Sequence, residues 1–519
     1  MSVASAPVTA SVDQAAVVAF LATGAALGCA APPRRIDTHA ATIFLGPDRA
    51  WKLKRAVRFA YLDFSTPDRR RAALDAELVL NRRTAPGLYL AVHPITRDAA
   101  GGLALDGAGD AVDWLLEMRR FPDGALLDEI AGTGTLEGQL LIQLADAIVA
   151  FHREAAPAPE ADGAAILRDI VAGNQTSMAL FPEILPPDLT DRLCAAHLDL
   201  VGRHAPLLDR RARTGRVRHG HGDLHLANIA LIEGHPTLFD CLEFDPALAT
   251  IDVLYDLAFL LMDCWHRGLH AEANILFNRY LDRSPEEESG MALLPLFLSV
   301  RAAIRAHVLA AQSQRAGDDR ALADMARAYL RLAEKVVRDQ PIRLIAIGGL
   351  SGTGKSAVAR ALAGSFGPPP GARILRSDVM RKRAAGVAPE TRLTSDHYAG
   401  AVSARVYATI DRLAAAALAQ HCAVIADAVF ARRDERDAIE VVAERKGVPF
   451  SGLWLETVEA IRVRRVTTRQ ADASDADARV VRAQRTTDIG DLDGWRTVDA
   501  NAALPEVVAA AMAEVGHRR

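Results

Sequence analysis

The spacing of hydrophobic residues changes at about residue 340. After this point, short apolar runs alternate with longer stretches in which apolar residues recur at helical spacing. The runs that predict strands are 343–347, 373–376, 423–426, 450–455 and 496–498. Strands separated by helices in this way predict a parallel five-stranded sheet with helices on both faces, so we expect an α/β fold for the second part of the chain.

The first part has a different pattern, because its predicted strands gather near its start. The expected elements are, in order, a helix capped by Ser11, a β-hairpin of 42–45 and 50–54, a helix at 67–83, strands at 88–95 and 111–118, and helices from 135 to 337. A small β-rich lobe followed by a larger helical lobe predicts an α+β domain. We therefore expect two domains, 1–339 and 340–519, joined by a short linker at 338–341.

The composition is that of a globular protein, with 519 residues of which 50% are hydrophobic and 24% charged. The formal net charge of −4 is unevenly divided. Residues 1–339 contain 35 Lys and Arg against 44 Asp and Glu, and residues 340–519 contain 26 against 21. The acidic first part argues against a nucleic-acid platform, and the mildly basic second part suits a phosphorylated ligand.

Five cysteines are scattered along the chain without a C-x-x-C pair, which is typical of a reducing compartment and argues against a cysteine zinc site. The apolar stretch 15–31 lacks the basic start of a signal peptide, because residues 1–33 contain no Lys or Arg. No uninterrupted apolar run has transmembrane length. These features predict a soluble, cytoplasmic protein with no membrane partner.

The most specific motif is G-x-x-x-x-G-K-S at 349–356, between a predicted strand and a predicted helix at 357–363. Its residues are Gly349, Leu350, Ser351, Gly352, Thr353, Gly354, Lys355 and Ser356. Glycines let backbone N–H groups converge on phosphate oxygens, and the helix N-terminus adds partial positive charge. We expect Lys355 to reach the β- and γ-phosphates and Ser356 to ligate Mg²⁺. The alternative is a glycine-rich turn that matches by coincidence.

Two aspartates follow predicted strands of the same sheet, namely Asp378 and Asp427. Ligands of such sheets bind beyond the carboxyl ends of the strands, where the P-loop also lies. Aspartates at these positions are often only helix caps. Because two of them accompany a P-loop, we expect both to belong to the site.

Arg462, Arg465 and Arg469 are spaced i, i+3 and i+7, so they share one face of a predicted helix. A solvated face is one interpretation of this stripe. The other is a lid that closes over a transferring phosphate, which the nearby P-loop favours.

A second chemical centre lies in the first part, around the sequence His219-Gly-His-Gly-Asp-Leu-His-Leu-Ala-Asn228. Asp223 can accept the proton of a substrate hydroxyl, and Asn228 with Asp240 can hold Mg²⁺. Zinc bound by His219, His221 and His225 is the competing interpretation. An oxygen-rich ligand set suits Mg²⁺ better than zinc.

Two lysines of the predicted hairpin, Lys52 and Lys54, lie on one face of a strand. Glu77 lies on the apolar stripe of the next helix, where a carboxylate needs a partner. A strand lysine paired with a helix carboxylate is how kinase lobes hold a lysine against the α- and β-phosphates. The sequence leaves open which lysine does this, and two surface lysines remain an alternative.

Residues 35–335 resemble the aminoglycoside phosphotransferase family, which is similar in fold to protein kinases, through Lys52–Lys54, Glu77, the sequence 221–228, Asp240 and Asp252 to Leu257. The resemblance implies that Asp223 is the catalytic base, that Asn228 and Asp240 ligate magnesium, that Lys54 with Glu77 is the phosphate clamp, and that Glu117 to Arg119 form the hinge that meets adenine. The sequence departs from the family in having no glycine-rich loop before Lys54, since the hairpin turn offers only Gly46.

Residues 342–519 resemble the small P-loop kinases of the gluconate kinase, polynucleotide kinase and chloramphenicol phosphotransferase type. The resemblance rests on the P-loop, on the sequence 376–382, on 427–430 and on the arginine stripe with 474–477. It implies that Asp378 is the base toward a substrate hydroxyl and that Asp427 is a carboxylate on the magnesium or substrate side. The tandem order is similar to bacterial two-domain proteins described as bifunctional aminoglycoside phosphotransferase/ATP-binding proteins.

These features predict an ATP- and Mg²⁺-dependent kinase with two nucleotide sites, which transfers the γ-phosphate to a hydroxyl of a small molecule. No obligate protein partner is implied. One alternative is that the first domain binds nucleotide without catalysis and regulates the second. Another is a nucleic-acid-end kinase, against which the lack of clustered aromatics and of a long basic stripe counts.

Overall fold

The computed structural model describes residues 12–38, 40–59, 62–134, 136–243, 245–468 and 473–516. The chain forms two compact units, which we describe separately. The first unit comprises residues up to 160 together with 212–256, and the second comprises 161–211 and all residues from 257 onward. The second unit therefore contains helices that precede residue 340 as well as the P-loop part. The domain boundary expected at 339 and 340 stays a prediction.

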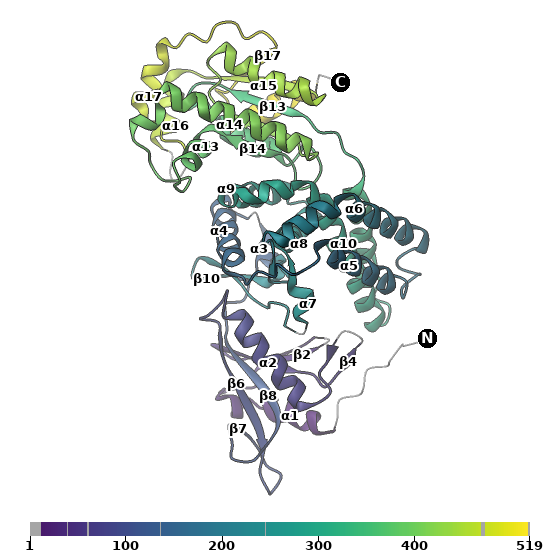
Figure 1. The fold of residues 1–519 in the computed structure, drawn as a ribbon. Helices are drawn as coiled ribbons and strands as arrows, with labels where there is room; N and C mark the ends of the chain where they lie inside the picture. The colour runs from purple at the N-terminus through teal and green to yellow at the C-terminus, as the bar shows by residue number, and fades with distance from the viewer. Residues whose placement is uncertain are drawn as a thin grey trace. The chain divides into compact units, whose positions relative to one another are not determined.

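The first unit is built on a six-stranded antiparallel sheet (Figure 1). Its strands, in spatial order, are β1 (Arg34–Asp37), β2 (Ala41–Leu45), β3 (Arg49–Lys54), β8 (Asp110–Arg119), β6 (Tyr89–Arg97) and β7 (Leu103–Leu105). Successive side chains of β8 point to opposite faces of the sheet. Leu115 packs with helix α1 (Val12–Ala22) on one face, and Leu116 packs with helix α2 (Pro67–Asn81) on the other. The predicted hairpin is formed by β2 and β3. The Ser11 cap lies outside the described residues.

Helix α2 begins where the sequence predicts, with the Thr66 side chain accepting a hydrogen bond from the backbone N–H of Arg69 and Pro67 in the first turn. Its inward stripe contains the buried residues Leu74, Glu77 and Asn81. The stripe therefore brings a carboxylate and an amide against the sheet. A small hairpin, β4 (Arg58–Phe59) and β5 (Leu62–Asp63), precedes the helix.

The later elements of the first unit include two small two-stranded sheets. They are α3 (Leu127–Thr133), α4 (Gly138–Glu154), β9 (Val217–His219), η2 (Leu226–Asn228), β10 (Ile229–Ile232), β11 (His235–Leu238), α7 (Pro246–Ala249) and β12 (Thr250–Asp252). β10 pairs with β11, and β9 pairs with β12. An antiparallel sheet followed by helices is the kinase-like fold class that the sequence predicts.

A further set of helices, without α7, precedes the P-loop part in the chain. They are α5 (Gly163–Met178), α6 (Pro187–Arg213), α8 (Val253–His266), α9 (His270–Arg283), the 3₁₀ helix η3 (Pro285–Leu293), α10 (Leu294–Arg315) and α11 (Arg320–Val337). Within the described residues, the helical stretch Pro285–Arg315 is long and apolar enough to cross a membrane. Because 67% of its most apolar window is buried inside the protein, a core helix accounts for it equally well.

The P-loop part has a five-stranded parallel sheet, which confirms the α/β prediction. Its spatial order is β14 (Arg373–Arg376), β15 (Val424–Asp427), β13 (Leu344–Gly348), β16 (Phe450–Glu456) and β17 (Trp495–Asp499). Each strand lies within a residue or two of its predicted position.

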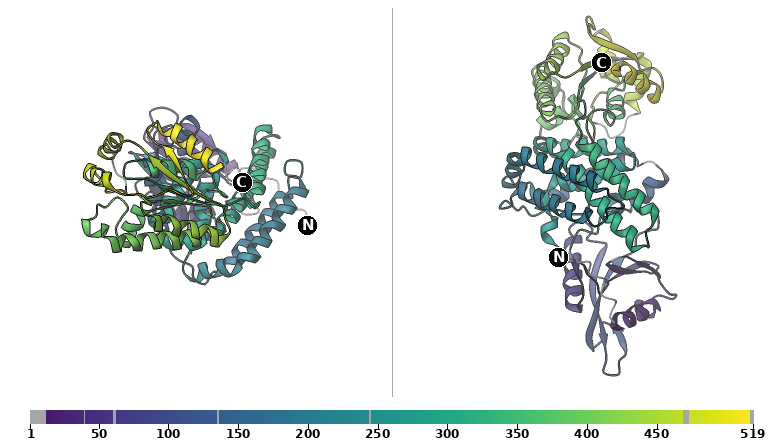
Figure 2. Two further views of the ribbon diagram at one scale, coloured as in Figure 1. Left: turned by 90° about the horizontal axis from the view of Figure 1, so that it is seen from above. Right: turned by 90° about the vertical axis from the view of Figure 1, so that its right-hand side faces the viewer.

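Helices flank this sheet in two layers (Figure 2). One layer is α12 (Lys355–Ala363) with α18 (Leu504–Gly516), and the other is α13 (Ser377–Ala384), α14 (Gly400–Ala419) and α15 (Arg433–Lys446). The helices α16 (Glu459–Thr467) and α17 (Ala478–Ala483) follow β16. The core between the sheet and the first layer joins Ile345 and Ile347 of β13 with Val358 and Leu362 of α12.

Candidate active sites

A β-hairpin brings two predicted metal ligands together in the first unit. β10 and β11 pair with Ile229 opposite Leu238, so the residues just outside the hairpin are neighbours. Asn228 ends the 3₁₀ helix before β10, and Asp240 follows β11. The backbone N–H of Phe239 donates to the carbonyl oxygen of Asn228 at 3.0 Å. The hairpin thus holds an amide and a carboxylate at one end of a short ladder.

The loop before η2 carries the predicted base, Asp223. The side-chain amide of Asn228 donates to the carbonyl oxygen and to Oδ2 of Asp223, at 2.9 Å in each case. Because the amide nitrogen makes these bonds, the amide oxygen is the atom of Asn228 suited to a metal ion. Buried Asp256 supports the loop by accepting the backbone N–H groups of His221 at 2.7 Å and Gly222 at 3.1 Å.

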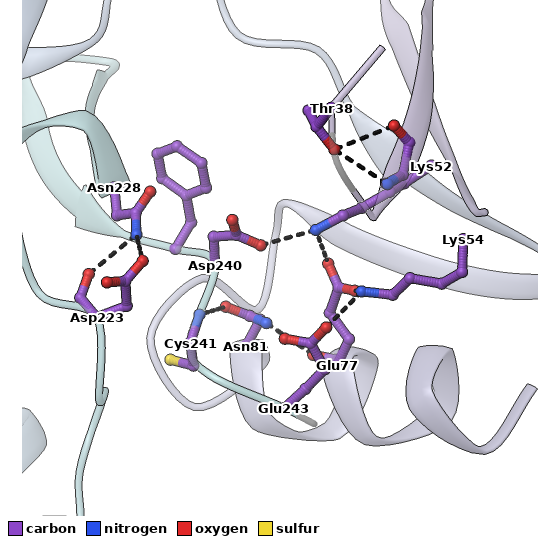
Figure 3. A network of polar contacts seen from close by, with 12 residues as sticks. Thr38, Lys52, Lys54, Glu77, Asn81, Asp223, Asn228, Asp240, Cys241 and Glu243 are labelled. Atoms are coloured by element: carbon purple, nitrogen blue, oxygen red, sulfur yellow. Dashed lines mark hydrogen bonds and ion pairs between the residues drawn. The ribbon is translucent and has the colours of Figure 1, made fainter. Parts of the chain in front are cut away.

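Glu77 binds both lysines of β3 (Figure 3). Its Oε1 lies 2.6 Å from Lys52 Nζ, and its Oε2 lies 2.6 Å from Lys54 Nζ. Lys52 Nζ is also 2.8 Å from Asp240 Oδ1, whereas Lys54 forms an ion pair with Glu243. The two lysines therefore have different surroundings. Lys52 meets the predicted metal ligand, and Lys54 is enclosed by two carboxylates with 3% of its side chain exposed.

Burial and charge pairing compete in setting the ionisation of this cluster. Burial lowers the pKa of Lys52, but Asp240 and Glu77 outweigh burial and raise that pKa well above its usual value. Burial raises the pKa of the Asp240 carboxyl, but Lys52 outweighs this effect and the pKa is lowered. For Glu243, burial dominates over the attraction of Lys54 and raises the pKa. Lys52 and Asp240 are both charged at neutral pH.

Asp240 has a left-handed backbone conformation, with φ of 60°. Aspartate tolerates this region better than most residues, but the surrounding structure must hold it there. Two hydrogen bonds do so. The backbone N–H of Asp240 donates to the Tyr89 hydroxyl at 3.1 Å, and the backbone N–H of Cys241 donates to the buried Asn81 side chain at 2.8 Å.

Lys52 and Asp240 line one cavity of about 330 Å³. Its apolar lining includes Ile43, Ala50 and Met118 from the six-stranded sheet and Phe239 from the chain after β11. Charged residues, among them Arg34, Arg119 and Glu129, line the same cavity, so its wall combines apolar and charged side chains.

Of the three residues expected to form the hinge, Met118 and Arg119 line this cavity, and Glu117 is not among the described residues that do so. The Glu117 carboxylate accepts a hydrogen bond from Arg49 at 3.0 Å, and its other oxygen lies 3.1 Å from His93 Nε2. Its assignment to adenine binding stays a prediction.

The P-loop runs from β13 into α12 and depends on glycines. Gly349, Gly352 and Gly354 have φ of 137°, 86° and 100°, in the region that L side chains rarely adopt. A Cβ at Gly352 would lie 2.7 Å from the carbonyl oxygen of Arg462, so close approach as well as conformation requires glycine here. The Lys355 ammonium donates to the carbonyl oxygen of Leu350 at 3.2 Å.

The strand ends bring Ser356, Asp427 and Asp378 to the P-loop. β13, β15 and β14 end at the same level, because Asp427 is opposite Ile347 on one side and opposite Arg376 on the other. The Ser356 hydroxyl donates to Asp427 Oδ2 at 2.5 Å, and Arg376 Nε lies 3.4 Å from the same oxygen. These three predicted residues and Lys355 line one cavity of about 770 Å³.

Asp378 is the second residue of helix α13, which directly follows β14. Burial raises the pKa of its carboxyl, and Asp427 adds to the rise, while Arg376 and a hydrogen bond from Ser474 oppose it. A carboxyl with a raised pKa beside a P-loop is suited to accept a proton from a hydroxyl group.

The two described arginines of the stripe both contact the P-loop backbone. Arg465 lines the P-loop cavity and donates to the carbonyl oxygen of Thr353 at 3.0 Å. Arg462 is 6% exposed, and its Nε donates to the carbonyl oxygen of Ser351 at 2.9 Å. Both guanidinium groups therefore brace the P-loop backbone. Arg469 lies outside the described residues, so a lid of three arginines stays a prediction.

Within the described residues, no group of three or more His, Cys, Asp or Glu side chains is placed to hold one metal ion. Two of the three histidines proposed as zinc ligands, His221 and His225, have other neighbours in the described structure. His221 Nε2 is 3.0 Å from the carbonyl oxygen of Phe239, and His225 Nε2 is 3.4 Å from Asp223 Oδ2. The structure gives no support to the zinc interpretation.

Two carboxylates of these sites were not predicted from the sequence. Glu243 pairs with Lys54, and its position three residues after Asp240 in an apolar run was the available signal. Asp475 lines the P-loop cavity and accepts hydrogen bonds from Lys382 at 2.5 Å and from the Tyr398 hydroxyl at 2.6 Å. It lies in the stretch 474–477 on which the resemblance rests, but its partners lie 77 and more residues away in the chain, so the sequence assigned it no role.

Comparison with known proteins finds uncharacterised relatives and kinase structures. Uncharacterised proteins of Mycobacterium tuberculosis and Mycobacterium bovis are 29% identical over 351 residues, which are 67% of this chain and 67% of theirs. A choline/ethanolamine kinase family protein from Mesorhizobium loti is similar over 63% of this chain and 96% of its own, with 14% identity and a TM-score of 0.38. A gluconokinase from Sinorhizobium meliloti is similar over 34% of this chain and 93% of its own, with 22% identity and a TM-score of 0.25.

The family comparison concerns the second part of the chain. Residues 344–487 match the model of a family described as AAA domain. The matched residues include the P-loop, Asp378, Asp427 and Arg465, which the structure gathers around one cavity. The second part of the chain is a P-loop domain, and it implies nucleotide binding.

Proposed function

We propose that the protein is an ATP-dependent phosphotransferase with two sites, each transferring the γ-phosphate of ATP to a hydroxyl group of a small molecule. The observation that carries the proposal is the P-loop cavity, where Lys355, the Ser356–Asp427 pair and Asp378 meet. A binding module needs the cradle, but it has no need of a half-buried carboxyl with a raised pKa that lines the same cavity.

In the P-loop site, backbone N–H groups of 349–356 and the Lys355 ammonium hold the phosphates. Asp378 takes the proton from the acceptor hydroxyl while the hydroxyl oxygen bonds to the γ-phosphorus. The bond between the γ-phosphorus and the bridging oxygen breaks, and ADP leaves with that oxygen. Arg465 lines the same cavity and adds positive charge near the phosphates.

In the first unit, Lys52 is the lysine that we assign to the phosphates, because it lines the cavity and meets Asp240. Glu77 orients Lys52, and Asp223 takes the proton of the acceptor. Lys54 is assigned to support of the loop that follows Asp240, through its ion pair with Glu243.

The oxygen donors at both sites fit Mg²⁺: an amide oxygen and a carboxylate at Asn228 and Asp240, a hydroxyl and a carboxylate at Ser356 and Asp427. Bound Mg²⁺ would neutralise charge on the phosphate oxygens. We also propose a cytoplasmic location without a membrane or nucleic-acid partner, from the sequence features alone.

The test uses the full-length protein, because the second unit combines segments from both sides of residue 340. ADP release is measured against a panel of hydroxyl-bearing metabolites in wild type, in Lys355→Ala, in Asp223→Asn and in the double variant. We expect acceptor-dependent activities that each single variant removes separately and the double variant removes completely. Wild-type activity in the folded double variant would refute the proposal.

A regulatory first unit is the second candidate. The turn between β2 and β3 offers only Gly46 near the nucleotide cavity, which leaves less backbone to cover phosphates than a glycine-rich loop does. This candidate predicts that the first unit binds ATP without turnover and that Asp223→Asn changes no activity.

A further inference from the structure

A buried cluster of charges joins the P-loop sheet to helices that precede it within the second unit. Arg373, on the edge strand β14, is 1% exposed. Its Nη2 lies 2.7 Å from Asp282 Oδ1 and 2.9 Å from Glu288 Oε1. Asp282 belongs to α9 and Glu288 to η3, both outside the segment that matches the P-loop family. A guanidinium is buried at this edge only because those carboxylates accompany it.

Asparagines of α9 complete the junction. Asn278 Oδ1 accepts the backbone N–H of Ile374 at 2.7 Å, as another strand would accept it. Asn274 Nδ2 donates to the carbonyl oxygens of Pro370 at 3.1 Å and Ala372 at 2.9 Å. Side chains of α9 therefore take the place of a neighbouring strand at this edge of the P-loop sheet, where the chain enters β14.

Glu288 contacts both ends of the segment that carries Asp378. One end is Arg373, at the start of β14, and the other is Arg383, in the last turn of α13, whose Nη1 lies 3.1 Å from each oxygen of Glu288. Asp378 lies midway between these two arginines in the chain. Glu288 thus links the start of the strand to the end of the helix, whereas Asp282 contacts only the strand side.

We propose that Glu288 is a positioning residue for the P-loop site, holding β14 and α13 so that Asp378 faces the phosphates. The proposal rests on the proposed function in that Asp378 is taken as the base. It means that the P-loop site is completed by chain outside the P-loop family segment. It also means that residues 257–339 serve the second site and not only a kinase-like lobe.

The first test measures hydrogen–deuterium exchange of the full-length protein, which needs no acceptor. Glu288→Gln keeps the shape of the side chain and removes the charge that both arginines share. We expect amide exchange in 374–384 to rise about tenfold or more, while exchange in β13 and α12 stays within twofold. Glu286→Gln is the matched control, because Glu286 is an exposed acid on the same 3₁₀ helix. Equal exchange in Glu288→Gln and Glu286→Gln would overturn the proposal.

A second variant covers the case in which Glu288→Gln does not fold. Arg383→Gln breaks only the α13 side of the link and leaves Arg373 with its two carboxylates. We expect faster exchange confined to α13. Exchange that rises evenly through the second unit would mean general destabilisation and would overturn the positioning role.

A kinetic readout separates positioning from stability. For an acceptor used by the P-loop site, we expect Arg383→Gln to lower kcat about tenfold with the KM for ATP within twofold of wild type, since the P-loop itself is untouched. A raised KM for ATP with unchanged kcat would overturn the proposal. If no acceptor supports turnover in wild type, the proposed function fails, and the exchange experiment still decides whether Glu288 holds the segment.

Discussion

Lys52 and Asp240, which are 188 residues apart in the chain, meet through an ion pair of 2.8 Å between Nζ and Oδ1. The pair joins the middle of the antiparallel sheet to the loop that follows β11, and both residues line the cavity of about 330 Å³. Lys54, two residues farther along the same strand, turns instead to Glu243. Two lysines that look equivalent in the sequence therefore have separable consequences when they are changed.

Lys52→Met and Lys54→Met are expected to fail differently. Lys54→Met leaves buried Glu243 without its partner and should lower the free energy of unfolding by about 3 kcal/mol, the range for breaking a buried pair. Lys52→Met should cost about 1 kcal/mol, because Glu77 keeps Lys54, yet it should lower turnover at the first site about 100-fold. Urea denaturation and ADP release measure the two effects in the Lys355→Ala background, which silences the P-loop site.

Glu243→Gln is the control for this pair, since it should reproduce the loss of stability of Lys54→Met. If Lys54→Met instead abolished turnover without a change in stability, Lys54 would be the phosphate-binding lysine and our assignment of the two residues would be reversed.

Gly352→Ala tests the P-loop cradle. The substitution places a Cβ 2.7 Å from the Arg462 carbonyl oxygen in a residue whose φ is 86°. We expect ATP affinity at this site to fall at least tenfold, because the loop must shift away from the geometry that serves the phosphates. Isothermal titration in the Asp240→Asn background isolates the P-loop site.

The matched control is Gly386→Ala, which has φ of 71° and no atom within 4 Å of the added Cβ. It carries the conformational cost of about 1–2 kcal/mol without the clash. An equal loss of affinity in both variants would show that strain, and not the close approach to Arg462, explains the effect.

The pH dependence of the P-loop site follows from Asp378. Burial raises the pKa of this carboxyl above its ordinary value of 3.8. A base works as the carboxylate, so activity should fall as the pH drops through the raised pKa, above the range of an exposed aspartate. The profile of kcat/KM against pH in the Asp223→Asn background measures this limb.

The same shift predicts a change in stability. A raised folded-state pKa means that folding favours the protonated form, so the stability associated with Asp378 is present below the unfolded-state pKa and is lost as the pH rises through the folded-state pKa. Asp378→Asn should therefore be more stable than wild type at pH 7 and should lose that advantage toward pH 4. A variant that is less stable at pH 7 would contradict the direction of the shift.

The local sequence pattern was sufficient to predict the strands of the five-stranded sheet and the P-loop. Buried parallel strands are short apolar runs, and the glycines and Lys355 of the loop are adjacent in sequence, so the five strands and the cradle could be predicted from the sequence alone. Asn228 and Asp240 are also close in the sequence, and the hairpin of β10 and β11 brings them together, while their role as metal ligands stays a prediction.

Pairings between distant segments could not be predicted in this way. The choice between Lys52 and Lys54 depends on Asp240 and Glu243, which approach β3 only in the folded chain. Helical spacing placed Arg462 on a stripe with Arg465, but spacing does not reveal that the Arg462 guanidinium is occupied by a carbonyl of the P-loop. Glu288 and Arg373 are 85 residues apart and carry no motif.

The final prediction asks whether the first unit is an enzyme. Asp223→Asn keeps the shape of the side chain and removes the proton acceptor, which costs about 10²–10⁴-fold in turnover where general-base assistance is lost. Asp240→Asn removes a charged metal ligand and the partner of Lys52, so ATP binding itself should become weaker and less dependent on Mg²⁺. Both are compared with wild type in the full-length Lys355→Ala background, by Mg²⁺-dependent ATP binding and by ADP release with an acceptor panel. A catalytic unit requires that Asp223→Asn loses turnover but keeps Mg²⁺-dependent binding, while Asp240→Asn loses both. If the Lys355→Ala protein binds ATP at the first unit without turnover, and Asp223→Asn behaves identically, the first unit is a nucleotide-binding regulator and only the P-loop site transfers phosphate.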